Sequence, residues 1–310
     1  MPVGTAFHDR TLALCHSLNY REWSGYYTVS VYEVHHEHEY NAIRNACALI
    51  DISPLYKHLV TGKDATKLVN RIITRDINKV AVGQVIYCCW CDEDGKVIDD
   101  GTITRLEENK YRWTAADPSL RWFRQNGVNM DVQIEDISEQ TAALALQGPT
   151  SAKLLKTVAD ADITNLKYFR KTSGKIAGVP VDISRTGYTG DLGYEIWIPW
   201  NDAVRVWDAL MDNGKQFEIH AAGGNHGDLR QRGFQRLDVF GAADCAAGED
   251  FHEIASCFPG LDDFGRGERS GGRPAYRDAG GRITVRSLNS RTVHEPWRCM
   301  IQPRRTDTPS

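Results

Sequence analysis

Two stretches of alternating apolar and polar residues, joined by a glycine-rich loop, place the strongest constraint on how this chain can fold. Residues 179–184 (VPVDIS) and 194–198 (YEIWI) alternate with the period of two that is typical of half-buried β-strands. The loop between them contains Gly187, Gly190 and Gly193. Glycine is the usual residue of a tight turn, and it also lets a flat ligand approach the main chain. Both interpretations are open for this hairpin-like loop.

Glu195 favours the ligand-binding interpretation. If Tyr194 and Ile196 face the core, Glu195 points to the opposite side of the sheet together with Trp197. A carboxylate beside an aromatic ring is unusual in such a strand, and its two oxygens can accept hydrogen bonds from two adjacent N–H groups. A pterin ring presents such a pair of donors. The alternative is a solvent-exposed glutamate on a half-buried strand.

The loop and its second strand resemble the signature of the aminomethyltransferase family. Residues 185–195 read Arg-Thr-Gly-Tyr-Thr-Gly-Asp-Leu-Gly-Tyr-Glu. In this family, which includes the T-protein of the glycine cleavage system, the tyrosine and the final glutamate line the tetrahydrofolate pocket. The resemblance therefore implies that Tyr188 and Glu195 bind folate.

Residues 85–98 predict a second hairpin, which is similar to the catalytic hairpin of the family. A strand turns through Asp92–Gly95 and returns into the aspartate pair Asp99 and Asp100. The resemblance matches the family's tyrosine and catalytic aspartate to Tyr87 and Asp99. A fixed carboxylate there would stabilise positive charge on the transferred group and relay a proton. Asp100 is the alternative, because neighbouring residues of a strand face opposite sides.

The resemblance covers roughly residues 1–218 and implies an α+β fold of mixed sheets with packed helices. Helical spacing is expected along one face from Tyr40 to Ile50, in residues 65–72 behind Asp64, in residues 202–211, and in a helix with Pro149 at its first position. One departure concerns the folate-contacting asparagine that the family usually has after the strand 110–114. Ala115 or Ala116 stands there, which leaves the identity of the substrate open.

Residues 219–310 differ in composition from the rest of the chain. No lysine follows Lys215, whereas arginines and glycines are frequent to the end. An altered reading frame and a natural disordered, arginine-rich tail both explain this change. The family continues here with a helix that supplies an arginine to the folate and with a C-terminal β-barrel domain, and neither is recognisable. The nearby arginines match no family motif: Arg230, Arg232 and Arg236.

Whole-chain properties exclude several functional classes. The 310 residues carry a net charge of −4, which predicts neither nucleic-acid binding nor attraction to an anionic membrane surface. There is no apolar run of transmembrane length and no signal-peptide core, so we expect a cytoplasmic protein. Cys88, Cys89 and Cys91 are clustered, and Cys88 and Cys91 have the Cys-x-x-Cys spacing. No second pair of this spacing supplies the remaining ligands of a zinc site, so we expect free thiols and no metal.

The sequence thus predicts a folate-dependent aminomethyltransferase. Tyr87, Asp99, Tyr188 and Glu195 are expected to surround tetrahydrofolate, and a lipoyl carrier protein is the partner that glycine cleavage implies. Two alternatives are open: a folate-dependent demethylase of a methylated small molecule, and a folate-binding protein without catalytic activity.

Overall fold

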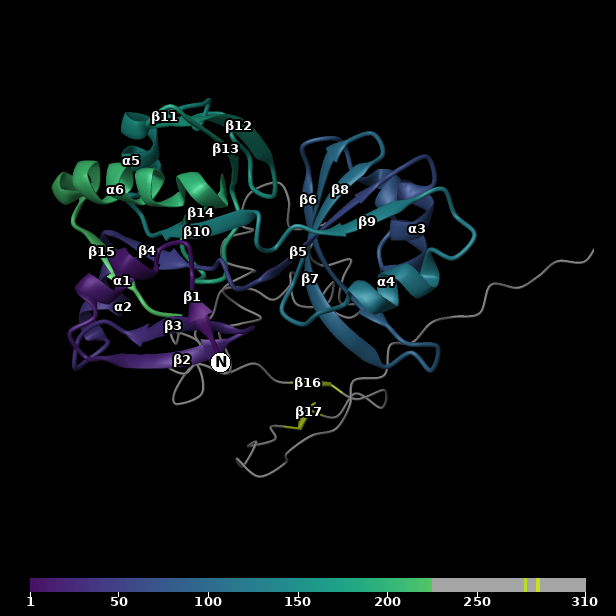
Figure 1. The fold of residues 1–310 in the computed structure, drawn as a ribbon, viewed down its shortest axis with the longest axis horizontal. Helices are drawn as coiled ribbons and strands as arrows, with labels where there is room; N and C mark the ends of the chain where they lie inside the picture. The colour runs from purple at the N-terminus through teal and green to yellow at the C-terminus, as the bar shows by residue number, and fades with distance from the viewer. Residues whose placement is uncertain (225–275, 278–282, 285–310) are drawn as a thin grey trace, which may run out of the picture.

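The computed structural model describes residues 1–224, 276–277 and 283–284. Figure 1 shows residues 1–224 as two lobes that lie side by side. The first lobe contains the largest sheet, and the second lobe is inserted between two strands of that sheet. A separate two-stranded pair consists of β16 (Tyr276–Arg277) and β17 (Ile283–Thr284).

A seven-stranded sheet forms the centre of the first lobe. Its order is β11-β12-β13-β14-β10-β4-β15, and all neighbours are antiparallel except β15, which runs parallel to β4. Helices α5 and α6 cover one face of it (Figure 1), where Leu144, Ile196 and Trp207 are buried. The elements are β4 (Cys47–Asp51), β10 (Thr141–Gln147), α5 (Ser151–Val158), β11 (Ala159–Asp160), β12 (Lys171–Ile176), β13 (Val179–Ser184), β14 (Gly193–Pro199), η2 (Trp200–Asp202), α6 (Ala203–Gly214), η3 (Lys215–Phe217) and β15 (Ile219–Ala222).

The N-terminal segment adds a small sheet and two helices to the first lobe. The sheet has the order β1-β3-β2, and α2 contacts β4 and β15. Glu39 of α2 is buried because its carboxylate accepts the main-chain N–H groups of Tyr32 at 2.6 Å and Gly223 at 2.8 Å. The elements are β1 (Val3–Gly4), α1 (His8–Leu14), β2 (Asn19–Trp23), β3 (Tyr26–Val31) and α2 (Glu37–Asn45).

The second lobe is built on a five-stranded sheet of the order β6-β7-β8-β5-β9. It leaves the first lobe after β4 and returns to it at β10, and these two strands are neighbours in the larger sheet. The elements are β5 (Tyr56–Thr61), α3 (Ala65–Ile72), η1 (Ile77–Lys79), β6 (Val85–Cys91), β7 (Val97–Glu107), β8 (Lys110–Ala115), α4 (Leu120–Asn126) and β9 (Gln133–Asp136).

The five-stranded sheet has one apolar face and one polar face. Ile86, Ile103 and Trp113 are aligned across three strands and join the core beneath α3 and α4. The Trp113 and Phe123 rings stack there with centroids 4.0 Å apart. Because side chains alternate along a strand, the residues between them face the other way. We call this opposite side the inter-lobe face, and it carries Lys57, Tyr87, Asp100, Thr102 and Arg112.

The α+β class and the two predicted hairpins are confirmed. β13 and β14 flank the glycine-rich loop, and β6 and β7 flank the turn at Gly95. The prediction of one helical face from Tyr40 to Ile50 is wrong beyond Asn45, where α2 ends. Cys47–Asp51 form β4 instead, because Leu49 and Ile50 pair with β10 in the centre of the sheet. Pairing with a distant strand overrides local periodicity here.

Two predicted helix starts differ in detail. Pro149 lies two positions before α5, which begins at Ser151, so it does not occupy the first helical position. Asp64 directly precedes α3, but its carboxylate accepts the main-chain N–H of Asp131 at 2.9 Å and does not cap the helix. Both residues belong to turns that connect a strand to the following helix.

Strand β15 follows the predicted boundary at residue 218 directly and is hydrogen bonded to β4. The division into residues 1–218 and 219–310 stays a prediction, because most of the second part lies outside the described residues, including Arg230, Arg232 and Arg236. Within the described part of the chain, no helix is long and apolar enough to cross a membrane.

Candidate functional site

Arg112 connects the two lobes. It extends from β8 on the inter-lobe face, and its Nη1 donates to Oδ2 of Asp182 on β13 at 3.1 Å. Its guanidinium carbon lies 4.2 Å from the ring centre of Trp197 on β14. Lys171 also donates to Asp182, at 2.7 Å. Burial alone would raise the pKa of Asp182, but Arg112 and Lys171 hold it below its usual value.

Glu195 points to the same side of the seven-stranded sheet as Trp197. Tyr194 and Ile196 belong to the core beneath α5 and α6, as the alternation predicts. Glu195 is only 9% exposed, so the solvent-exposed alternative is wrong. Its Oε2 accepts a hydrogen bond from the Thr186 hydroxyl at 2.6 Å. Burial raises the pKa of Glu195, and Thr186 and Arg112 oppose that rise.

Two glycines of the loop between β13 and β14, which we call the signature loop (residues 185–193), leave room for the side chain of Gln147. A Cβ atom would lie 2.2 Å from Oε1 of Gln147 if placed on Gly187, and 2.1 Å if placed on Gly193. The same Oε1 accepts a hydrogen bond from the Thr189 hydroxyl at 2.8 Å. Only Gly190 serves the turn by its backbone, with a φ of +77°. The loop is therefore held from inside by Gln147, which is fully buried.

The tip of the loop is held from outside by α2. Arg44 donates to the carbonyl of Thr189 at 2.9 Å and to the carboxylate of Asp191. Tyr188 lies between these attachments and the Gln147 contacts, and it is 38% exposed. The predicted folate-binding tyrosine therefore stands on a loop that is fixed on both sides, with its own ring accessible.

The aspartate pair is divided between the two faces of β7. Asp99 lies opposite Trp90, on the side of the helices, and is 8% exposed. Its Oδ1 accepts the N–H of Asp100 at 2.8 Å, and its Oδ2 accepts the N–H of Asp117 at 3.1 Å. Burial raises the pKa of Asp99, and these two N–H groups oppose that rise. Asp99 thus holds the loop between β8 and α4.

Asp100 lies on the inter-lobe face and is exposed. The hydroxyl of Tyr87, on the neighbouring strand, donates to its carboxylate. Partial burial and this hydrogen bond raise the pKa of Tyr87 above its usual value. Tyr87 and Asp100 therefore share a face with Arg112, whereas Asp99 does not. The catalytic role of Asp99 stays a prediction, and the geometry favours its neighbour.

Lys57 is a further charged group on the inter-lobe face. Its side chain is fully buried, and Nζ donates to the carbonyl of Ser53 at 2.6 Å. Burial lowers the pKa of Lys57 to about 7, while Asp51 and Asp136 act in the opposite direction. Lys57 therefore changes its charge close to neutral pH.

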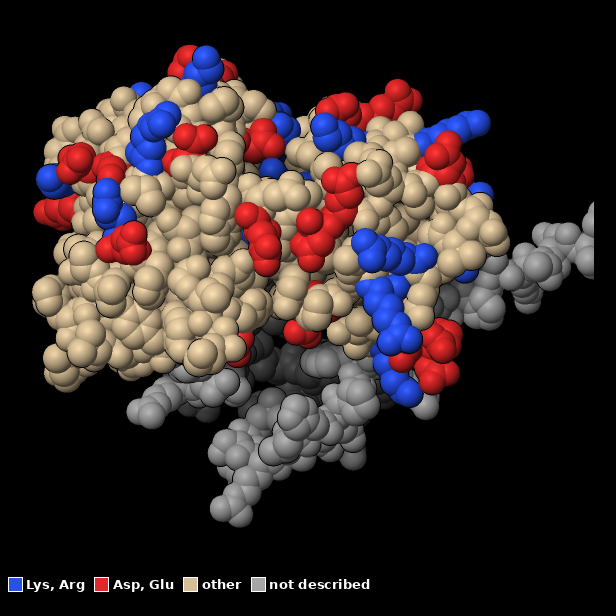
Figure 2. Space-filling view, in the orientation of Figure 1, with Lys and Arg blue, Asp and Glu red and all other residues tan. Residues whose placement is uncertain are grey.

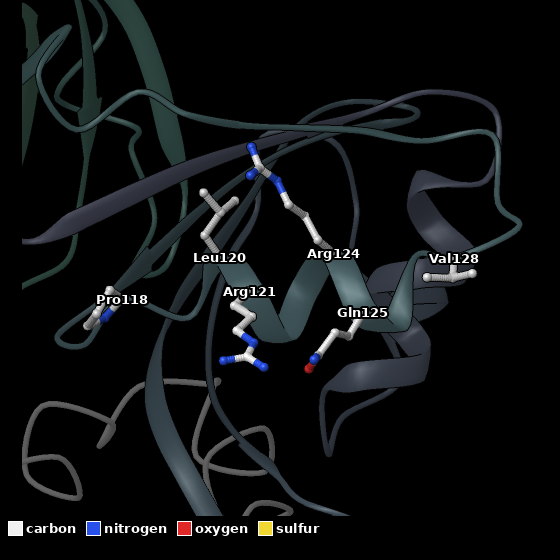
Figure 3. A pocket seen from close by; sticks show the side chains of 6 residues that line it. All are labelled: Pro118, Leu120, Arg121, Arg124, Gln125 and Val128. Carbon is white, nitrogen blue, oxygen red and sulfur yellow. The ribbon is translucent and has the colours of Figure 1, made fainter.

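A surface pocket on the second lobe lies apart from these residues. Figure 3 shows that Arg121 and Gln125 point to one side of α4, whereas Arg124 points to the other. None of the residues predicted to bind folate lines it; its lining residues are Pro118, Leu120, Arg121, Arg124, Gln125 and Val128. In Figure 2, acidic side chains are visible along the junction of the two lobes, while basic side chains gather on the lower part of the second lobe.

Sequence reasoning did not identify Arg112, Gln147 or Asp182. The signal for Arg112 was a cation placed between the two aromatic residues Tyr111 and Trp113 of a strand. For Gln147 it was an amide at the end of the apolar strand 143–146. Asp182 follows the period of its strand, so its sequence gave no sign of a buried ion pair.

Comparison with known proteins identifies related sequences. The family model described as "GCVT N-terminal domain" matches residues 7–230. An aminomethyltransferase of Halothermothrix orenii is 38% identical over 189 residues, covering 60% of this chain and 53% of the relative. An aminomethyltransferase of Caldanaerobacter subterraneus is 36% identical over 190 residues, covering 60% and 51%. The chain thus spans about half the length of the curated relatives it matches.

A solved structure shares the fold. The crystal structure of glycine cleavage system aminomethyltransferase T from Bartonella henselae superposes with a TM-score of 0.64. The match covers 72% of this chain and 60% of that one, at 20% sequence identity. At that identity, the likeness supports the arrangement of the elements and no conclusion about the ligand.

Proposed function

The chain belongs to the family defined by the GCVT N-terminal domain, and we propose that it is a tetrahydrofolate-dependent aminomethyltransferase. The proposed reaction transfers a one-carbon unit from an aminomethyl donor to tetrahydrofolate. The observation that carries the proposal is a buried carboxylate, Glu195, on the strand whose Trp197 contacts Arg112, because Arg112 shares the inter-lobe face of the other lobe with an exposed tyrosine–aspartate pair. The sequence prediction left the donor open; we propose an aminomethyl group on a lipoyl carrier protein, the partner that glycine cleavage implies.

The polar groups of the site fit a pterin ring. Oε1 of Glu195 makes no hydrogen bond to any described residue, and Arg112 has buried N–H groups without a partner in the same part of the chain. Such groups are expected to pair with a ligand or with water. Glu195 would accept the two adjacent N–H donors of the pterin, and Tyr188 would contact its ring.

We propose Asp100 as the carboxylate that acts at the reacting atoms. Tetrahydrofolate, when bound, supplies the amine nitrogen that takes up the carbon. Asp100 would stabilise the positive charge that develops there and receive the proton that the amine loses. Tyr87 would orient the carboxylate through its hydroxyl hydrogen bond. Asp99, with both oxygens bonded to main-chain N–H groups, would keep the neighbouring loop in position.

The two aspartates provide the test. Asp100→Asn is expected to retain tetrahydrofolate binding, measured by calorimetric titration, and to lower turnover with an aminomethyl-loaded lipoyl carrier by about a hundredfold. Asp99→Asn should instead lower the unfolding temperature and leave turnover of the folded fraction within about tenfold. The reverse result would return the catalytic role to Asp99. Folate binding without turnover by the unsubstituted protein would refute the transferase and leave a folate-binding protein.

A further inference from the structure

Only one of the three guanidinium nitrogens of Arg112 donates a hydrogen bond to a described residue. Nη1 donates to Asp182, whereas Nε and Nη2 are buried and have no hydrogen-bond partner among the described residues. The side chain is 6% exposed. Buried N–H groups of native proteins are rarely left unpaired, so this unpaired pair indicates a missing partner.

Arg10 shows the pair of hydrogen bonds that Nε and Nη2 of an arginine can donate together. Its Nε and Nη2 donate to the two oxygens of Asp208 at 2.7 and 2.8 Å. The two N–H groups belong to one edge of the planar guanidinium and donate side by side. Arg10 uses this edge at the surface of the molecule, whereas Arg112 presents the same edge inside it. Arg112 is also held in place, because Asp182 binds its Nη1 and Trp197 lies under its plane.

Arg112 and Glu195 are electrostatic neighbours that do not touch. Each favours the charged form of the other, although burial works against both charges. No ion pair within 4.0 Å joins the two side chains in the described structure, and Glu195 uses only its Oε2, toward Thr186. Glu195 and Trp197 share one face of β14, and Trp197 contacts the Arg112 guanidinium, so a carboxylate oxygen and two N–H groups without a described partner occur in the same part of the structure.

The edge of a 2-amino-4-oxopteridine matches this arrangement. Along that edge it presents an amino N–H, a ring N–H and an oxo oxygen, which are two donors followed by an acceptor. The carboxylate of Glu195 can accept from both donors, and the oxo group then requires a donor next to the carboxylate. We propose that Arg112 donates to this 4-oxo group and thereby sets the specificity of the site for oxopteridines. This inference rests on the proposed function.

A hydrogen bond from Arg112 to the 4-oxo group would make the site selective against 2,4-diaminopteridines. These compounds carry an amino group in place of the 4-oxo group, so that two sets of N–H donors would face each other at Arg112. A site that is built to hydrogen bond one group discriminates strongly against an analogue that leaves buried polar atoms unpaired. The discrimination should therefore depend on Arg112 and much less on the rest of the pocket.

The test is a pair of calorimetric titrations of the full chain, one with tetrahydrofolate and one with its 2,4-diamino counterpart. The unsubstituted protein is expected to prefer tetrahydrofolate. Arg112→Met should weaken tetrahydrofolate binding by about tenfold or more, as expected for a charge-assisted hydrogen bond. It should leave the diamino compound unaffected or bound more tightly. The matched control Arg10→Met, which removes an exposed arginine from an ion pair, should change neither titration.

Arg112→Lys keeps the charge and can still pair with Asp182, and it guards against a failure of the methionine variant to fold. Its preference for the oxo compound should lie between those of the other two proteins. An equal weakening of both ligands in either variant, with the preference retained, would overturn the inference and make Arg112 a structural residue. If the unsubstituted protein binds neither compound, the proposed function itself fails.

Discussion

The signature loop and the β6–β7 hairpin carry the residues of the proposed site on different lobes, and they are built in different ways. Around the loop, Glu195 and Gln147 are buried, and each has hydrogen-bond partners in the first lobe. On the hairpin, Tyr87 and Asp100 are exposed and bonded to each other. Under the proposed function, the first lobe would supply buried groups that recognise the ligand, and the second lobe would supply accessible reactive groups.

The largest expected effect comes from breaking the ion pair between the lobes. Asp182→Ala would leave Arg112 and Lys171 without their shared carboxylate. Loss of one partner of a fully buried pair costs about 3–5 kcal/mol, and the partial exposure of Asp182 places the expected cost at the lower end, about 3 kcal/mol. The free energy of unfolding in urea measures this loss. Asp208→Ala, which removes the exposed partner of Arg10, is the control and should cost less than about 1 kcal/mol. Equal costs would show that the pair between the lobes is no more buried in solution than a surface pair.

The buried part of the site also predicts a pH dependence of stability. The pKa of Lys57 is about 7 in the folded protein, against 10.5 for an ordinary lysine. Between these values the unfolded chain binds more protons, so stability rises with pH by up to about 1.4 kcal/mol per pH unit and is lost as pH falls toward 7. Lys57→Met should reduce this slope between pH 7 and 9, measured by urea unfolding. An unchanged slope would show that other titratable groups cause this pH dependence.

A smaller effect is expected inside the signature loop. Gly193→Ala would place a methyl group on the buried amide of Gln147, and such overpacking typically costs about 1–3 kcal/mol. Combining it with Gln147→Ala should recover part of that loss, which a double-mutant cycle of unfolding free energies would reveal. Purely additive costs would mean that the glycine serves the backbone only. Gly190→Asn is the matched control, because asparagine tolerates the positive φ of that turn.

The smallest effect is expected at the outer attachment of the loop. Asp191→Ala removes an ion pair with Arg44, whose side chain is 40% exposed, and should cost less than about 1 kcal/mol. Tetrahydrofolate affinity should change less than about threefold, since the Gln147 contacts remain. A large loss of affinity would show that α2, and not the interior of the first lobe, fixes Tyr188.

The sequence correctly predicted those parts of the molecule in which the local residue pattern alone determines the structure. The alternation in residues 194–198 placed Glu195 opposite the core, and the turn at Gly95 placed the second hairpin. The strand at Cys47–Asp51 was missed because its partner β10 is distant in sequence. Arg112 and Asp182 were missed for the same reason, since their pairing requires two lobes to meet. For the aspartate pair, the alternation predicted opposite sides and the resemblance favoured Asp99, whereas the pairing register places Asp100 on the inter-lobe face.

The insertion of the second lobe has a consequence for how the protein reaches its native state. β4 and β10 can pair only after the roughly ninety residues between them have brought their ends together. Closing so long a loop is entropically costly while the segment is unfolded, and contacts of large sequence separation slow folding. We therefore expect the second lobe to fold first and to act as the template on which the larger sheet closes. The contact between Arg112 and Asp182 would then form late, so ligand recognition would be among the last properties that the folding chain acquires.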